Sequence, residues 1–178
     1  MIETVLKFWF DDTSPAQWWK KDEDFDEVIR QRFTAVHRQA VRCELFYWRS
    51  TAHGRLAEIL ILDQFSRNMF RNSPQAFAND PLALALAQEA VACGADRQMS
   101  AVKRSFFYLP FMHSESRIIH EEAEKLYSQP GLESNLEWEI KHRKIIERFN
   151  RYPHRNDILG RQSTAEEREF LKQPGSSF

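Results

Sequence analysis

Apolar side chains recur at steps of three and four along most of this chain, which is the period of an α-helix that buries one face. The segment 24–48 shows it clearly, with Phe25, Ile29, Phe33 and Val36 at such spacings. No segment shows a convincing alternation of apolar and polar residues, which a half-buried strand would need. Glycine is scarce, with 5 in 178 residues. The sequence therefore predicts an all-α protein.

Start and stop signals divide the chain into about seven or eight helices. Asp80 followed by Pro81 predicts a helix start with Asp80 as its N-cap, and Gly94 predicts the end of that helix. Ser100 is the expected cap of the long segment 101–128, which Pro110 is expected to bend. The expected helices cover residues 2–10, 24–48, 53–70, 80–94, 101–128, 135–149 and a last segment capped by Ser163 or Thr164.

The length and composition favour one domain that spans residues 1–178. The helix–turn–helix spacing over 80–149 is loosely like that of tetratricopeptide repeats, without a regular period. We therefore expect an irregular tetratricopeptide-like array in a single domain.

The net charge of −1 provides no basic field, so a nucleic-acid partner is not expected. No apolar run reaches the length of a membrane span, and the apolar N-terminal run meets acidic residues too soon for a signal peptide. We expect a cytoplasmic protein with no membrane partner, in which Cys43 and Cys93 are buried free thiols. The oligomeric state is open.

The segment 148–161 gathers arginines in a stretch that Pro153 and Gly160 prevent from being one helix. Positive charge at a helix C-terminus explains one or two of these arginines, but not all of them. Two interpretations stay open for the rest. The arginines form internal ion pairs with acids such as Asp63 or Glu115, or the same network forms a site for an anionic ligand.

Two further polar stretches lie within apolar helices. In 62–68, Asp63 and Arg67 are four residues apart, either as a surface pair or as buried groups with partners. In 104–115, His113 is either a core histidine or part of a His–Glu pair beside the bend at Pro110.

Searches for catalytic and metal-binding motifs find none that is complete. There is no CxxC, HExxH, GxSxG or phosphate-binding glycine loop. A di-iron bundle needs two Glu-x-x-His motifs, and only Glu139–His142 occurs. No metal and no cofactor are predicted, and the motifs identify no reaction.

Five blocks in order carry a resemblance that covers nearly the whole chain: LDQFSRNMFR (62–71), AFANDPLALALA (76–87), FYLPFMHSE (107–115), HRKIIERFNRYPHRN (142–156) and ILGRQSTAEEREFL (158–171). Together they resemble the bacterial family known as domain of unknown function 924. The resemblance implies a tetratricopeptide-like helical fold and no particular activity. Asn150 stands where the family usually has glycine, Tyr152 where phenylalanine is common and His120 where glutamine often appears. Because asparagine tolerates a left-handed backbone, the turn at Asn150 is expected to form.

Our preferred hypothesis is a concave site that binds a small anionic molecule or an acidic peptide, with arginines on the anion and acids holding the arginines in place. The predicted site residues are Asp63, Arg67, Arg104, Tyr108, His113, Glu115, Arg143, Arg151, His154, Arg155 and Asn156.

Two alternatives remain. One is a hydrolase-type enzyme in which His154 or His113 is the general base, oriented by Glu115 or Asp63. The other is a protein–protein interaction scaffold, which predicts an exposed apolar patch that includes Trp9, Trp18, Trp19 and Trp48.

Overall fold

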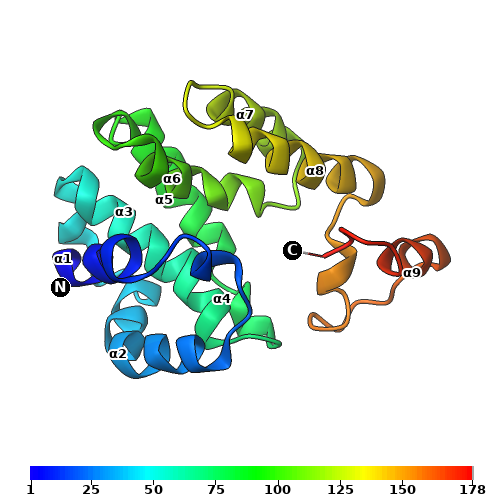
Figure 1. Cartoon of the computed structure of the whole chain (residues 1–178), viewed down its shortest axis with the longest axis horizontal. Coiled ribbons are helices and arrows are strands. Elements are labelled where there is room, and N and C mark those ends of the chain that lie inside the picture. Colours follow the sequence, from blue (N-terminus) through cyan, green and yellow to red (C-terminus); the bar gives the residue numbers. More distant parts are fainter. Residues whose placement is uncertain (178) are drawn as a thin grey trace.

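The computed structural model describes residues 1–177, and this part of the chain contains helices and no strand (Figure 1). The helices are α1 Ile2–Lys7, α2 Glu23–Val41, α3 Ala52–Leu60, α4 Ser66–Met69, α5 Asp80–Ala92, α6 Ala101–Met112, α7 Arg117–Tyr127, α8 Glu133–Phe149 and α9 Ala165–Leu171. A π-helical turn at Ile61–Phe65 joins α3 to α4 without a break, so the labelled segments form eight continuous helices within residues 1–177. The all-α prediction of about seven or eight helices is confirmed, whereas the likeness to tetratricopeptide repeats stays a prediction.

Local capping chemistry explains several helix ends. The side chain of Ser100 accepts a hydrogen bond from the backbone of Lys103 at the start of α6, as predicted. Thr164 and Glu167 form a reciprocal capping box at the start of α9. Asn150 ends α8 with a φ of 55°, so this asparagine does adopt the left-handed backbone.

Other boundaries differ from the expected ones. The segment 101–128 is two helices, because α6 ends at Met112 and α7 begins at Arg117. Asp80 is the first residue of α5 rather than its cap, since Asn79 takes the cap position and no side chain there bonds the helix backbone.

The cysteine prediction is half right. Cys43 and Cys93 are free, but both are exposed rather than buried. Cys43 lies in the turn after α2 with a φ of 58°, and Cys93 is the C-cap of α5. Helix ends of this kind lie at the surface, and the helical period alone does not reveal where a helix stops.

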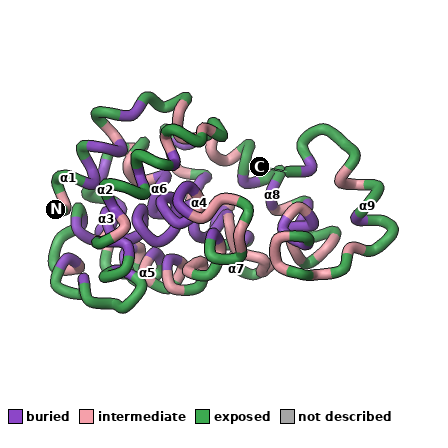
Figure 2. Tube along the Cα trace, turned by 90° about the horizontal axis from the view of Figure 1, so that it is seen from below, coloured by how far each residue is buried: buried purple, intermediate pink, exposed green. Residues whose placement is uncertain are grey.

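Large aromatic side chains fill the main core, and buried segments gather around α3, α4 and α6 (Figure 2). Trp9, Phe33, Phe65 and Phe106 are almost completely buried. Residues 56–66 are all buried, so this stretch of the helix formed by α3, the π turn and α4 is covered on every side. Its polar residues therefore lie inside the protein, where they need partners.

The tryptophans do not form the exposed patch that a scaffold would use. Trp9 and Trp48 are 0% and 4% exposed, and the half-buried Trp18 donates a hydrogen bond from Nε1 to the backbone oxygen of Trp9. Trp19 is exposed. Three of these four tryptophans are thus buried or half-buried.

Beyond α8 the chain turns back, and α9 lies at the far end of the molecule (Figure 1). A smaller apolar cluster of Ile145, Ile146 and Tyr152, with Phe149 and Phe170 packed against it, holds this region together. The 3-10 turn Pro153–Arg155 carries an arginine back to the main body. Within residues 1–177, none of the helices has the length and apolarity needed to cross a bilayer.

Candidate functional site

Five side chains that are distant in sequence meet in one polar cluster. Asp63 comes from the π turn, Arg67 from α4, Asp80 from the start of α5, His113 from the end of α6 and Arg155 from the turn after α8. These five residues are called the arginine–aspartate cluster below. The cluster joins the C-terminal region to the core.

Asp63 is the most deeply buried acid of the cluster, with 1% of the residue exposed. One oxygen lies 2.8 Å from Nδ1 of His113 and 3.0 Å from Nη1 of Arg67, and the other accepts from Gln64 at 2.6 Å. Burial alone would raise the pKa of Asp63, but Arg67 and His113 outweigh it and hold the pKa below its usual range. Asp63 is therefore a buried carboxylate at neutral pH.

Asp80 is shared by the two arginines. Arg67 donates two parallel hydrogen bonds to its carboxylate, at 2.8 and 2.9 Å, and Arg155 donates a longer one at 3.3 Å. Asp80 was not among the predicted site residues, because Asp before Pro at a helix start already had an explanation as a cap. Its place within the block AFANDPLALALA (76–87), one of the five that carry the family resemblance, was the one signal that pointed to a further role.

Arg155 has fewer acidic partners than Arg67 among residues 1–177. Its guanidinium lies between the rings of Phe77 and Tyr152, with Cζ at 4.6 and 4.5 Å from the two ring centres. Nη2 donates to the backbone oxygen of His113 at 3.0 Å, and Nε is buried without an acceptor in residues 1–177. Burial and the charge of Arg67 lower the pKa of Arg155, and Asp80 offsets them only in part.

His113 is the uncharged member of the cluster at neutral pH. Burial and the neighbouring Arg67 lower the pKa of His113 below its ordinary value, although Asp63 acts in the opposite direction. With Nδ1 donating to Asp63, the imidazole presents Nε2 as an acceptor.

One edge of the cluster reaches the surface. The side chains of Arg67, Asp80 and His113 are 19%, 16% and 14% exposed. Those of Asp63 and Arg155 are 2% and 7% exposed, so they lie deeper. A solute that reaches the outer three side chains would meet Asp63 and Arg155 beyond them.

A second network fixes the turn that carries Arg155. Arg161 donates two hydrogen bonds to Glu115, at 2.6 and 2.9 Å, and the backbone nitrogen of Tyr152 donates to the same carboxylate at 2.7 Å. Arg161 also donates to the side-chain oxygen of Asn156 at 3.0 Å. Burial would raise the pKa of Glu115, but these donors outweigh it and lower the pKa. Glu115 and Asn156 thus hold the backbone of the turn in place.

Arg151 and His154 also belong to this turn. Arg151 makes a two-bond pair with Glu167, at 2.6 and 2.8 Å. The ring of His154 lies 5.5 Å from that of Tyr152, and burial with the charge of Arg155 lowers the pKa of His154 to about 4. Arg151 thus joins the segment before the turn to α9, and His154 packs beside Tyr152.

Three predicted residues lie in other interactions. Arg104 and Tyr108 share Gln129, and the hydroxyl of Tyr108 donates to Asp96 at 2.5 Å. Arg104 precedes His113 by nine residues, which is about 13 Å along a helix axis. Arg143, on α8, pairs with Glu124 and Glu147. The structure does not bring these three into contact with the arginine–aspartate cluster.

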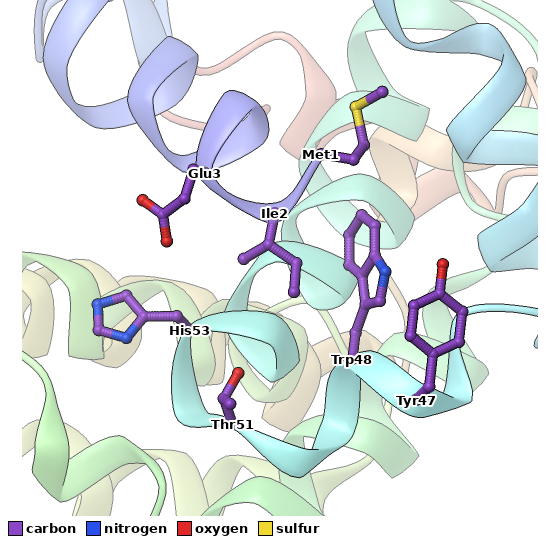
Figure 3. A pocket seen from close by; sticks show the side chains of 7 residues that line it. All are labelled: Met1, Ile2, Glu3, Tyr47, Trp48, Thr51 and His53. Atoms are coloured by element: carbon purple, nitrogen blue, oxygen red, sulfur yellow. The ribbon is translucent and has the colours of Figure 1, made fainter.

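Two hollows lie elsewhere on the protein. The larger, of about 550 Å³, lies between α1 and the turn before α3 (Figure 3) and is lined by Met1, Ile2, Glu3, Tyr47, Trp48, Thr51 and His53. The other, of about 310 Å³, is called the α2 hollow below and is lined by His37, Arg38, Val41, Arg42, Phe70, Gln75, Ala78 and Asn79. None of the predicted site residues lines either hollow.

Fold and site together define a class: an all-helical protein whose C-terminal turn is fastened to the core by a buried arginine–aspartate cluster. The chain belongs to the family described as "Bacterial protein of unknown function (DUF924)", whose model matches residues 5–175. This confirms the resemblance seen in the sequence blocks.

A solved structure is similar to this protein over almost the full length of the chain. The protein of unknown function ATU0120 from Agrobacterium tumefaciens is 42% identical, the match covers 96% of each chain, and the TM-score is 0.92. No curated protein matches this chain.

Proposed function

We propose that the arginine–aspartate cluster binds a small anionic ligand, a carboxylate or a phosphate, through Arg155 and Arg67. One observation carries the proposal: Arg155 is a buried guanidinium whose Nε has no acceptor in residues 1–177 and whose carboxylate partner is shared with Arg67. The carboxyl end of an acidic peptide presents the same chemistry as a small carboxylate.

The negative charge of the cluster is distributed unequally. Arg67 lies within ion-pair distance of both Asp63 and Asp80, whereas Asp80 is the one acid of residues 1–177 within that distance of Arg155. With His113 neutral, the positive charges of the two arginines equal the negative charges of the two aspartates. Most of that negative charge nevertheless lies beside Arg67. An additional anion beside Arg155 would therefore meet a guanidinium with little other compensation.

The donors of Arg155 support the same conclusion. A guanidinium has about five N–H donors in a planar fork, which suits carboxylate and phosphate oxygens. The carboxylate of Asp80 and the backbone oxygen of His113 accept from two of these donors. A buried donor without a partner costs about 1–3 kcal/mol, so a ligand oxygen that accepts from Nε recovers that free energy.

We expect anions to raise the thermal stability of the wild-type protein. A ligand at about 100 times its Kd stabilises the folded state by about 2.7 kcal/mol, equivalent to roughly 5–10 °C in Tm for a chain of this size. Thermal-shift measurements with acetate, succinate and inorganic phosphate at constant ionic strength provide the test.

Arg155→Lys is the informative variant, because it keeps the charge but removes the planar fork. It should lose most of the ligand-dependent shift. Arg148→Ala, in an exposed pair with Glu166, is the matched control and should retain it. Because phosphate stabilises many proteins without specific binding, equal shifts in wild type and Arg155→Lys would refute the site.

A hydrolase-type activity is the second candidate, and the hydrogen bond between Asp63 and His113 favours it. A buried carboxylate that accepts from Nδ1 orients an imidazole so that Nε2 can take a proton from water or a hydroxyl. The lowered pKa keeps His113 in the neutral form that a general base requires. Arg67 and Arg155 would stabilise negative charge that develops beside it.

For this candidate we expect measurable turnover of p-nitrophenyl phosphate or p-nitrophenyl acetate that falls about 100-fold or more in His113→Asn. Arg148→Ala changes an exposed pair outside the cluster and serves as the comparison variant. Turnover that persists unchanged in His113→Asn would exclude His113 as the base.

A further inference from the structure

We propose that the α2 hollow is a second binding site, specific for a small carboxylic acid with an apolar body. Its lining residues come from the last turns of α2 and from the loop between α4 and α5. The proposal rests on its volume, on its charge and on the distribution of apolar and polar side chains around it. It does not depend on the function proposed for the arginine–aspartate cluster.

The charge of the lining favours an anion. Arg38 and Arg42 contribute two guanidinium groups, and no carboxylate is among the eight lining residues. Within residues 1–177, the guanidinium of Arg38 makes no ion pair or hydrogen bond, and Arg42 has one long ion pair, at 3.8 Å, with Glu44. Most other arginines of the chain are paired with acids, so Arg38 retains its full donor capacity for a ligand.

Part of the lining of the hollow is apolar. Val41, Phe70 and Ala78 contribute hydrocarbon surface, and the ring of His37 packs against that of Phe70 with centroids 5.3 Å apart. A volume of about 310 Å³ is at the lower limit for small-molecule sites. An inorganic ion would leave this surface uncovered, whereas a compact aromatic or branched acid would cover it.

Two polar side chains of the lining, His37 and Asn79, are held in place by contacts with Ser66. Nε2 of His37 lies 2.9 Å from Oγ of Ser66, and Nδ2 of Asn79 lies 3.4 Å from the same oxygen. Nδ1 of His37 has no hydrogen bond within residues 1–177 and belongs to a residue that lines the hollow. The side-chain amide of Gln75 lies on the same rim. These groups can accept or donate to the ligand without rearrangement of the core.

The probe is sodium benzoate, and benzamide is its neutral counterpart of the same shape. In NMR titrations of the full chain, benzoate should cause saturable shifts in the backbone amides of residues 37–42 and 75–79. Because a hydrogen bond to a charged group adds to affinity, benzamide should bind at least about tenfold more weakly, and Arg38→Ala should weaken benzoate by a similar factor.

Arg97→Ala removes an exposed arginine outside the hollow and should leave the affinity for benzoate unchanged. Arg155→Lys should also leave it unchanged, which separates this site from the arginine–aspartate cluster. The proposal is overturned if benzoate shows no saturation at about 10 mM, which is ten times a Kd of 1 mM. It is equally overturned if benzamide binds as well as benzoate, or if Arg97→Ala weakens binding as much as Arg38→Ala.

Discussion

Asp80→Ala should lower the free energy of unfolding by about 3–5 kcal/mol, because removal of one partner from a buried ion pair leaves uncompensated charge. Here one carboxylate serves two guanidiniums. After its removal Arg67 still contacts Asp63, but Arg155 loses its one acidic partner among the described residues. Most of the cost should therefore come from Arg155, which lies in the interior with its charge unmatched.

Urea unfolding followed by tryptophan fluorescence measures the effect. Glu166→Ala is the matched control, because it removes the 61% exposed acid that pairs with Arg148, and such a pair contributes at most about 1 kcal/mol. In an Arg155→Met background the cost of Asp80→Ala should fall, since the uncompensated charge is gone. A loss below 1 kcal/mol for Asp80→Ala in the wild-type background would mean that Asp80 does not hold the cluster together.

Asp80 also determines how a bound ligand would change the stability of the protein. An anion that binds Arg155 competes with Asp80 for one guanidinium, or bridges to it from the opposite side. The first mode displaces the Asp80 contact, whereas the second leaves it in place and strengthens the attachment of the Pro153–Arg155 turn to the core. Binding and stability are therefore coupled through one carboxylate, and the two experiments report on the same contacts.

Helical periodicity and capping residues were enough to predict the fold class and most helix positions. Ser100 and Thr164 act as the caps that the sequence indicates, and Asn150 takes the expected left-handed turn. These features depend on interactions within a few residues, which a sequence shows directly. The break between α6 and α7 depends on how the end of α6 packs, and the period continues through it.

The polar cluster was predictable only in part. Asp63, Arg67, His113 and Arg155 were proposed together, and the structure brings them together. Asp80 was missed because its partners are far away in sequence, and a local role had already accounted for it. Arg104 and Arg143 were also predicted to lie in the site, and an arginine that is half-buried needs a partner. Which partner it finds depends on tertiary packing, and each found a nearby acceptor instead.

The buried His142 and the half-buried His154 are expected to make this protein sensitive to mild acid. Burial, with the charge of Arg155, lowers the pKa of His154 to about 4, and burial lowers that of His142 to about 3. In an unfolded chain histidine has a pKa of about 6.5. Between these values the unfolded chain binds protons that the folded protein does not, so the free energy of unfolding falls as the pH falls.

From pH 7 to pH 5 the two histidines together should lower the free energy of unfolding by about 4 kcal/mol, or roughly 8–16 °C in Tm. His37 and His113 act in the same direction, because burial lowers the pKa of each. Glu139 acts in the opposite direction, because burial raises its pKa. The folded pKa values of Asp63 and Glu115 are lowered, so their contributions to stability are lost mainly below about pH 5, where carboxyl groups of the unfolded chain gain protons.

The measurement is urea unfolding at several pH values between 7 and 5, and its readout is the slope of the unfolding free energy against pH. The double variant His142→Gln, His154→Gln removes both groups and should have a smaller slope, reduced by the share of these two histidines, even if it is less stable at pH 7. His53→Gln, at an exposed position, controls for the loss of an imidazole and should keep the wild-type slope. A wild-type protein equally stable at pH 7 and pH 5, or a double variant with the wild-type slope, would show that burial of these histidines does not govern acid stability.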